Sequence, residues 1–382
     1  MYPGFTYVIL RRTFPELQRA LELDTPIPTP TGFKRMGDIY PGDFVIAPDG
    51  AAVVVTHASL PTIDPHGTFR ITFDNGETLI ASAGHKWVVQ TAQQRHAARR
   101  LKSGRQKTSC TDITPQIVTT LDIHNSLRVE DGKRSNYSIA TAKAWDAPEQ
   151  VLPVDPYVLG AWLGDGTRNQ GAITSIDQEI LDNITAAGYV IRKRPSHIYE
   201  YGILGLKHDL RRAGVILDKH IPDIYFCGSA TQRLALLQGL MDTDGCAKTD
   251  GLAIFANTNV RLSDAVFVLA ASLGLKPRKK TSLTRRRDGS LTGTTTFWVY
   301  WTSTTPVFRL ARKRLRLPKE LRGVTNQHYI VACERIEDRL CKCIAVEHPS
   351  HQYLAGYAAI PTHNSHLSFI DYEMSKLGGT FH

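Results

Sequence analysis

The 382-residue sequence lacks the features that mark several common protein classes. It has no apolar run long enough to span a membrane and no GxxxxGK[ST] loop for nucleotide phosphates. Its six cysteines include no CxxC pair of the kind that binds zinc, and Cys341 and Cys343 are too close for an ordinary disulfide. No secretory signal is recognised, so we expect reduced thiols and a cytoplasmic location.

The overall composition is that of a globular protein with a polyanionic partner. Hydrophobic residues make up 42% of the chain and charged residues 21%, which excludes an intrinsically disordered protein. The length allows two or three domains. The net charge of +10 favours nucleic acid as the partner.

The predicted type of secondary structure changes twice along the chain. Short β-type runs separated by turn signals such as Asp74-Asn75-Gly76 fill residues 20–90 and predict an all-β module. Helical periodicity then appears in residues 156–163, 180–187, 231–241 and 263–273, with a strand at 296–301. A strand-like pattern returns from residue 329 to residue 363, so we expect a β domain interrupted by an inserted α/β domain.

A basic stretch at residues 93–107 lies near the end of the first β region. It is interpreted either as a solvated helix face or as an element that contacts phosphates. Its cations are Arg95, Arg99, Arg100, Lys102, Arg105 and Lys107.

The region expected to be inserted repeats one nine-residue motif, at 158–166 and at 237–245. Each copy is an apolar helix with glycine at its third position, Gly160 or Gly239, which lets two helices approach closely. Each copy ends in Asp-Gly, and the final glycine is expected to adopt the left-handed conformation that stops a helix.

Packing of the two helices would bring Asp165 and Asp244 together. Two convergent carboxylates in a basic protein predict a Mg²⁺ site for phosphodiester cleavage. The motif pair resembles the LAGLIDADG homing endonucleases, although Trp162 and Gly164 depart from the pattern in the first copy. The resemblance implies an α+β fold with pseudo-two-fold symmetry, whose β-saddles lie along the major groove of a long double-stranded DNA site. It also implies a basic residue near the metal, for which the candidates are Lys219, Lys279 and Lys280.

A second kind of chemistry is indicated by His363-Asn364-Ser365 near the end of the chain. An asparagine amide can attack its own backbone carbonyl and cut the chain after itself. A hydroxyl on the next residue can hold an acyl group as an ester. This pair is what a protein needs in order to excise itself and join its flanks.

The β regions resemble the splicing domain of inteins, the all-β, horseshoe-shaped Hint module. The matching segments are Ala20 to Pro26, Met36 to Asp43, Ser82 to His85, Tyr353 to Gly356 and Ile360 to Asn364. The expected domains are an N-extein segment (1–19), a Hint part (20–145), the endonuclease (146–325), a second Hint part (326–364) and a C-extein segment (365–382).

One departure from most inteins decides the expected mechanism. The first residue, Ala20, has no nucleophile, whereas most inteins begin with Cys or Ser. Trp87, Cys343 and Thr362 match the residues that mark class 3 inteins, in which an internal thiol acts instead.

The resemblance implies the following steps. Cys343 attacks the carbonyl of Arg19 and expels the amine of Ala20, with His85 and Ser82 assisting. The acyl group then passes to Ser365, and Asn364 cyclises with the help of His363, leaving Arg19 joined to Ser365. Cys341 is the alternative nucleophile, since alternation along a strand places it on the same face as Cys343. His351 is a further candidate for polarising Asn364, and no cofactor is expected for splicing.

The flanking segments resemble part of a phage terminase large subunit, which implies a phage-infected bacterial host. Two alternatives remain open: a site-specific DNA endonuclease whose splicing residues have decayed, and a DNA-binding protein that has lost both activities.

Overall fold

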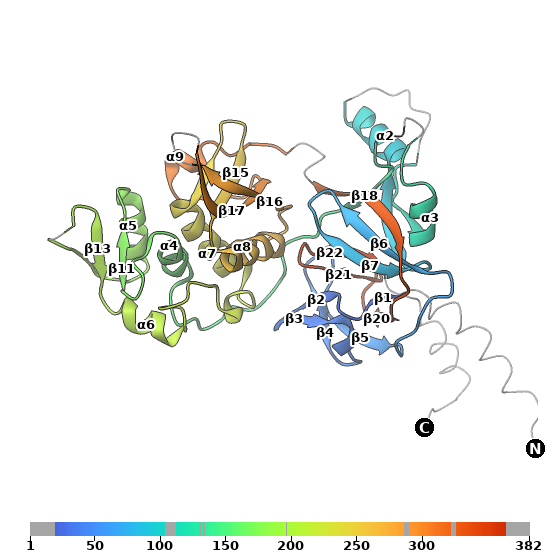
Figure 1. Cartoon of the computed structure of the whole chain (residues 1–382), viewed down its shortest axis with the longest axis horizontal. Coiled ribbons are helices and arrows are strands. Elements are labelled where there is room, and N and C mark those ends of the chain that lie inside the picture. Colours follow the sequence, from blue (N-terminus) through green and yellow to red (C-terminus); the bar gives the residue numbers. More distant parts are fainter. Residues whose placement is uncertain are drawn as a thin grey trace, which may run out of the picture. The chain divides into compact units, whose positions relative to one another are not determined.

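The chain forms two compact units in the computed structural model, which describes residues 20–103, 112–129, 132, 134–195, 197–285, 290–321 and 326–363. One unit combines residues 1–142 with 327–382, and the other is residues 143–326. The chain leaves the first unit after β10 (Tyr137–Ala140) and returns in β18 (Gln327–Ile336), and these two strands pair antiparallel (Figure 1). The second unit is therefore an insertion between two neighbouring strands of one sheet.

The first unit is built mainly from antiparallel strands. Its largest sheet has ten strands, in the order β19-β1-β7-β6-β18-β10-β8-β22-β21 with β9 paired to β8. A β2-β3 hairpin and a β20-β5-β4 sheet accompany it. The bounds are β1 (Leu21–Glu22), β2 (Pro26–Thr29), β3 (Gly32–Arg35), β4 (Phe44–Ile46), β5 (Ala52–Ala58), β6 (Thr68–Phe73), β7 (Thr78–Ser82), β8 (Lys86–Thr91), β9 (Gln116–Thr119), β19 (Cys341–Lys342), β20 (Ile344–Val346), β21 (Gln352–Ala355) and β22 (Ile360–His363).

The turn signals of the sequence fall between these strands. The predicted Asp74-Asn75-Gly76 turn joins β6 to β7, and Gly76 has a φ of 90°, which a residue with a Cβ adopts only at a cost. Phe69, Ile71 and Phe73 alternate along β6 and are buried in the core. The β strands expected for this module are confirmed, but the expectation of an all-β module is not, because helices also lie between the strands.

In the described part of this unit, two short helices and one 3-10 turn interrupt the strands: α2 (Ala92–Lys102), α3 (Thr120–Asn125) and η1 (Met36–Asp38). Thr91 and Thr119 begin α2 and α3 as N-cap residues of capping boxes. The basic stretch is therefore helical as far as Lys102, and its Arg105 and Lys107 lie outside the described residues. Among the described residues, no helix is long and apolar enough to cross a membrane.

The second unit repeats one order of elements twice. The first half contains α4 (Pro156–Asp165), β11 (Ala172–Thr174), α5 (Gln178–Ala186), β12 (Ile191–Lys193), β13 (Glu200–Ile203) and α6 (Leu206–Arg212). After η2 (Asp223–Tyr225), the second half contains α7 (Ala230–Thr243), β14 (Gly245–Ala247), β15 (Leu252–Asn257), α8 (Val260–Ser272), β16 (Arg278–Arg285), β17 (Leu291–Thr302) and α9 (Ala311–Arg314). The four helices and the strand that the sequence predicts here are confirmed as α4, α5, α7, α8 and β17.

The two sheets of this unit correspond strand by strand. Their orders are β11-β13-β12 and β14-β15-β17-β16. Gly166 bridges to Ile173 in the first half, as Gly245 pairs with Phe255 in the second. The internal repeat of the sequence is therefore also a repeat of the structure, with β11, β13 and β12 equivalent to β15, β17 and β16.

Candidate functional sites

The first candidate site surrounds Ala20, the expected first residue of the splicing segment. Ala20 forms a buried cluster with Cys341 and Cys343. Its N–H donates a hydrogen bond to Ser82 Oγ at 2.9 Å, and its carbonyl accepts one from the Ser82 N–H, also at 2.9 Å. β1 lies between β7, which ends at Ser82, and β19, which begins at Cys341. The amide nitrogen of residue 20 is therefore held by one hydroxyl, and the residue shares a buried cluster with two cysteines.

The two thiols differ in their surroundings. Burial, together with the charges of Glu22 and Asp64, raises the pKa of the Cys341 thiol to about 12. Cys343 lies between β19 and β20, where its N–H donates to Ser59 Oγ at 3.0 Å and its carbonyl accepts from the Ser59 N–H at 2.8 Å. Since the thiolate is the reactive form of cysteine, Cys341 is poorly suited to act as a nucleophile in this state.

The turn that carries Ser82 and His85 is fixed by a buried carboxylate. The His85 N–H donates to the Ser82 carbonyl at 3.1 Å, which closes the turn. Asp64, only 2% exposed, accepts from the Gly84 N–H at 3.1 Å and from the His66 N–H at 2.9 Å. The sequence analysis did not single out Asp64, because one aspartate in a loop carries no local signal.

The aromatic pair His85 and Trp87 packs against the last strand of the unit. The fully buried His85 ring is hydrogen-bonded through Nε2 to Thr362 Oγ1. The Trp87 ring lies edge-on to it, with 4.8 Å between centroids. Trp87 Nε1 donates to Thr120 Oγ1 at 2.9 Å, and the Thr120 N–H donates to the His85 carbonyl at 2.9 Å. The structure thus brings three predicted residues together and adds Thr120, which the sequence analysis missed.

The C-terminal strand β22 is anchored beside the same site. Thr362 pairs with Tyr353 on β21, and burial together with Cys343 raises the pKa of the Tyr353 phenol well above its usual range. The His363 side chain is buried, and its ring centroid lies 6.3 Å from that of His351. The remaining predicted junction residues lie outside the described residues: Arg19, Asn364 and Ser365.

The second candidate site lies where α4 and α7 cross. A Cβ on Gly160 would lie 2.3 Å from the carbonyl oxygen of Leu236, and one on Gly239 would lie 2.2 Å from that of Tyr157. The helices therefore touch backbone to backbone, and the predicted close approach at the two glycines is confirmed.

The glycine that ends each motif has a different role from the one predicted. Gly166 has a φ of −72°, and Gly245 is not among the glycines with positive φ, so the predicted left-handed conformation is wrong. A Cβ on Gly166 would lie 2.3 Å from the Trp162 carbonyl oxygen, and one on Gly245 would lie 2.5 Å from that of Met241. Glycine is needed because the chain turns tightly from the helix end into the next strand.

Asp165 and Asp244 lie within one electrostatic environment at this crossing. Desolvation raises the pKa of both carboxyl groups, and the charge of Asp244 raises that of Asp165 further, while Lys219 opposes both shifts. Asn257 Nδ2 donates to Asp244 Oδ2 at 2.7 Å. No group of three or more metal-binding side chains occurs in the described part of the chain. Two carboxylates suffice only where water and phosphate oxygens complete the coordination shell of a hard cation.

Each motif helix is capped by one lysine ammonium group. Lys219 Nζ donates to the carbonyls of Leu163, Gly164 and Gly166 at 3.1, 3.2 and 2.8 Å. Lys313 Nζ donates to the carbonyls of Met241, Asp242 and Gly245 at 2.9, 2.7 and 2.6 Å. A cation at a helix C-terminus satisfies free carbonyls and the negative end of the helix dipole. Lys313 was not predicted, because it lies far from the motif in sequence.

The two other predicted lysines lie elsewhere in the unit. Lys279 Nζ pairs with Asp264 Oδ1 at 2.8 Å and lies 4.3 Å from the Phe267 ring centroid, so it is engaged by α8. Lys280 pairs with Trp298 across β16 and β17 and is exposed. Of the three candidates, Lys219 is the one that shares the electrostatic environment of both aspartates.

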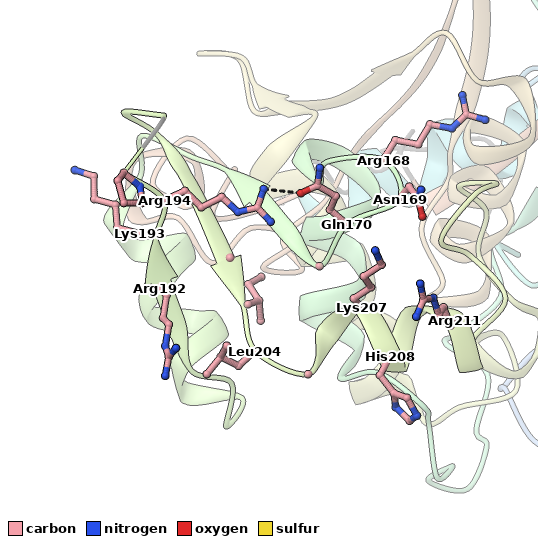
Figure 2. Close-up of a pocket in the computed structure, with 15 residues that line it drawn as sticks. Arg168, Asn169, Gln170, Arg192, Lys193, Arg194, Leu204, Lys207, His208 and Arg211 are labelled. Carbon is pink, nitrogen blue, oxygen red and sulfur yellow. Dashed lines mark hydrogen bonds between the residues drawn. The ribbon is translucent and has the colours of Figure 1, made fainter.

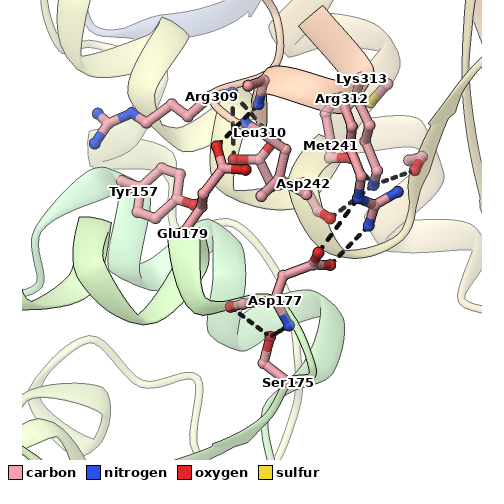
Figure 3. Close-up of polar contacts among 12 residues, drawn as sticks. Tyr157, Ser175, Asp177, Glu179, Met241, Asp242, Arg309, Leu310, Arg312 and Lys313 are labelled. Carbon is pink, nitrogen blue, oxygen red and sulfur yellow. Dashed lines mark hydrogen bonds and ion pairs between the residues drawn. The ribbon is translucent and has the colours of Figure 1, made fainter.

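Asp242 is a second acid of the second motif, with a role different from that of Asp244. Its buried carboxylate accepts from Tyr157 Oη at 2.9 Å and from the backbone N–H groups of Arg309 and Leu310 at 3.1 and 3.2 Å (Figure 3). It therefore fastens the segment before α9 to the α4–α7 crossing.

A basic pocket of about 760 Å³ opens on the first half of the unit (Figure 2). None of the described residues that line it carries a carboxylate. Arg194 Nη1 donates to Gln170 Oε1 at 2.5 Å and is thereby turned across the pocket. The lining cations are Arg168, Arg192, Lys193, Arg194, Lys207 and Arg211. Such a surface suits phosphate groups.

Comparison with known proteins finds no matching family model. The chain is 35% identical over 357 residues to the replicative DNA helicase DnaB of Mycobacterium intracellulare, covering 92% of this chain and 60% of that relative. It is 37% identical over 87 residues to the DnaB helicase of Mycobacterium leprae, covering 23% and 14%. The chain thus spans less than two thirds of either curated relative.

Solved structures similar to this chain include inteins and a homing endonuclease. The MchDnaB-1 intein matches with a TM-score of 0.30 and 13% identity, covering 90% of this chain and 100% of that one. The gp41-1 intein matches with a TM-score of 0.18 and 30% identity, covering 19% and 53%. The endonuclease I-DmoI in complex with DNA and Mn matches with a TM-score of 0.27 and 16% identity, covering 44% and 98%.

Proposed function

We propose that the chain is a self-splicing intein that excises residues 20–364 and joins Arg19 to Ser365, and that its inserted unit is a DNA endonuclease. One observation carries the splicing proposal: the backbone nitrogen of Ala20 is hydrogen-bonded to Ser82 inside a buried cluster with two thiols. Cleavage before Ala20 would release this nitrogen as an amine. A residue without a nucleophile thus lies beside the groups that could act for it.

In the proposed first step, the thiolate of Cys343 attacks the carbonyl carbon of Arg19. The bond from that carbon to the Ala20 nitrogen breaks, and the nitrogen takes up a proton, so that a thioester and a free amine result. Ser82 Oγ accepts a hydrogen bond from this nitrogen, and its hydroxyl could donate one to the nitrogen as the amide becomes an amine. Cys343 is chosen over Cys341 because it matches the residue that marks class 3 inteins. In the following steps Ser365 accepts the acyl group and Asn364 cyclises beside His363.

Intact-mass spectrometry of the expressed chain tests this proposal. We expect the unmodified chain to yield free Ala20–Asn364 and a peptide that joins the two flanks. Cys343→Ala should abolish both products, whereas Cys341→Ala and the exposed-thiol control Cys246→Ala should retain them. Loss of splicing in Cys341→Ala alone would overturn the assignment of the nucleophile.

The endonuclease proposal rests on the crossing of α4 and α7. Asp165 and Asp244 would hold the metal, for which we propose Mg²⁺; when bound, the metal would activate water and stabilise the leaving oxygen. Desolvation raises the pKa of both carboxyl groups, and the charge of Asp244 raises that of Asp165 further, an unfavourable arrangement that a divalent cation would relieve. Lys219 and Lys313 hold the helix ends that present the acids.

The substrate to test is a DNA duplex that encodes the joined flanks, with no insertion. We expect metal-dependent cleavage of both strands, and loss of cleavage in Asp165→Asn and Asp244→Asn. Asp264→Asn is the matched control, because that aspartate pairs with Lys279 on α8. Equal cleavage by all four proteins would refute the proposed site.

The absence of a nucleophile at residue 20 also permits the alternative of an endonuclease whose splicing has decayed. Under that alternative the chain would stay at full mass under reducing conditions while still cutting DNA. The host protein that we propose from the flanks is a phage terminase. Neither curated relative described above is a terminase.

A further inference from the structure

We infer that the two halves of the inserted unit divide DNA recognition: the first half holds the phosphate backbone, and the second half reads the bases. This inference rests on the proposed endonuclease function. It is drawn from the equivalent sheets of the two halves, whose faces carry different chemistry.

The free face of the second sheet is identified by the burial of its strands. Val299 and Trp301 on β17 are buried, and β17 packs on α8. Tyr300 and Trp298 therefore face away from the helices, and Arg278 and Lys280 pair with them on β16. In the first half, burial does not separate the two faces, because Ala172 and Glu200 are buried as well as Ile173 and Ile203. The strand register identifies the equivalent face: Arg192 pairs with Gly202 as Arg278 pairs with Tyr300, so Arg192, Gly202 and Glu200 lie on the face that corresponds to the free face of the second sheet.

The free face of the first sheet offers little that could read a base. Its central strand β13 presents Gly202, which has no side chain, and Glu200, which is 8% exposed. Thr167 Oγ1 donates to the Glu200 carboxylate at 2.9 Å, and Arg194 does so at 3.3 Å. What remains around this face is the rim of cations that line the basic pocket. Arg and Lys contacts to phosphates fix position without reading sequence.

The free face of the second sheet is longer and carries groups able to read base edges. β16 and β17 have 8 and 12 residues, against 3 and 4 in β12 and β13. Twelve residues extend over about 40 Å, and a two-stranded ribbon fits the major groove. Hydroxyl groups are held in place on this face: Trp298 Nε1 donates to Ser282 Oγ at 2.8 Å, and Thr284 and Thr296 share a hydrogen bond of 2.5 Å.

Two arginines occupy equivalent positions and allow a matched comparison. Arg192 pairs with Gly202, which pairs with Ala172. Arg278 pairs with Tyr300, which pairs with Ile254. The same substitution at the two positions therefore separates a contact with phosphate from a contact with a base.

The experiment selects bound duplexes from a randomised DNA library and sequences them. The full chain carries Cys343→Ala and Asn364→Ala so that it stays intact, and no divalent metal is present. With Arg192→Gln we expect all sequences to bind more weakly by a similar factor, a salt dependence lower by about one phosphate contact, and unchanged preferred bases. With Arg278→Gln we expect a loss of roughly 5- to 150-fold discrimination at one base pair, with the other preferences retained.

Each possible outcome decides the inference. It is overturned if Arg192→Gln changes a preferred base, or if the preferred bases are spread equally over the two halves of the site. Failure of the parent protein to bind any duplex would sink the endonuclease proposal as well. Thr296→Val provides a second test of base reading if Arg278→Gln lowers the unfolding temperature of the unit. That variant should change preference at a different base pair and leave the salt dependence unaltered.

Discussion

Replacing Gly160 by alanine tests whether backbone contact between α4 and α7 organises the inserted unit. An alanine in a helix interior normally stabilises by about 1 kcal/mol relative to glycine. Here the added Cβ would lie 2.3 Å from the Leu236 carbonyl oxygen, 2.9 Å from the Leu240 nitrogen and 3.1 Å from the Gly239 Cα. These are backbone atoms of a packed helix, so the helices must move apart by about 1 Å to restore an ordinary contact.

Overpacking of this kind costs about 1–3 kcal/mol, and the gain in helix propensity does not remove the clash. We therefore expect Gly160→Ala to lower the free energy of unfolding. For a unit of this size, the midpoint should fall by roughly 2–10 °C. DNA cleavage should fall with it, since the aspartates are presented from the ends of the two helices.

Scanning calorimetry of the full chain is the suitable assay, because the two compact units can unfold in separate transitions. The transition assigned to the inserted unit should move, while the splicing yield should not. Gly239→Ala should act in the same direction, since its Cβ would lie 2.2 Å from the Tyr157 carbonyl oxygen. Stabilisation by about 1 kcal/mol in either variant would show that the helices are not in backbone contact.

Three further predictions concern the polar groups of the two sites. Since the native pKa of Asp165 is raised, its ionised form lowers stability as pH rises through that pKa. Asp165 is exposed, so solvent screens much of this effect, and Asp165→Asn should stabilise the metal-free protein by only about 0.2–0.5 kcal/mol at pH 7, with the gain lost near pH 3, as thermal unfolding in EDTA would show. Thr120→Val removes the hydrogen-bond acceptor of Trp87 Nε1, so it should slow splicing and destabilise the splicing unit by about 1–3 kcal/mol. Thr120→Ser keeps the hydroxyl and should restore the splicing rate, and equal splicing rates in the two variants would refute this role. Lys313→Met should reduce DNA cleavage about as much as Lys219→Met, because each ammonium group holds one helix end; unequal losses in a cleavage assay would argue against equivalent roles.

The parts of the structure that the sequence predicted are those governed by local rules. Turn residues between short β-type runs predicted the strands of the first unit, and the repeated motif predicted the crossing at Gly160 and Gly239. What the sequence could not predict depends on contacts between distant segments. Asp64 reaches Gly84 and Thr120 reaches Trp87 only because strands far apart in sequence are neighbours in the fold.

The error about the last glycine of each motif has a similar origin. Glycine after a helix most often signals a left-handed cap, but it is equally required wherever a Cβ would strike backbone. Gly166 belongs to the second kind, because a Cβ at this position would lie 2.3 Å from the Trp162 carbonyl oxygen. A sequence pattern alone does not separate these two reasons, since both exclude every other residue.

The two halves of the inserted unit agree where backbone meets backbone and differ where side chains make the contact. Both motifs need glycine at the crossing and a lysine at the helix end, because no other group fits those carbonyls and that space. At the sixth position of each motif the requirement is looser. Leu163 is buried there by apolar packing in the first motif. Asp242 is buried at this position in the second motif, where its carboxylate accepts four hydrogen bonds. The same freedom applies to the exposed sheets, which take no part in the crossing. A rigid crossing that presents two acids can therefore keep its geometry while the outer sheets carry different side chains, and this is the physical condition for dividing DNA recognition between the two halves.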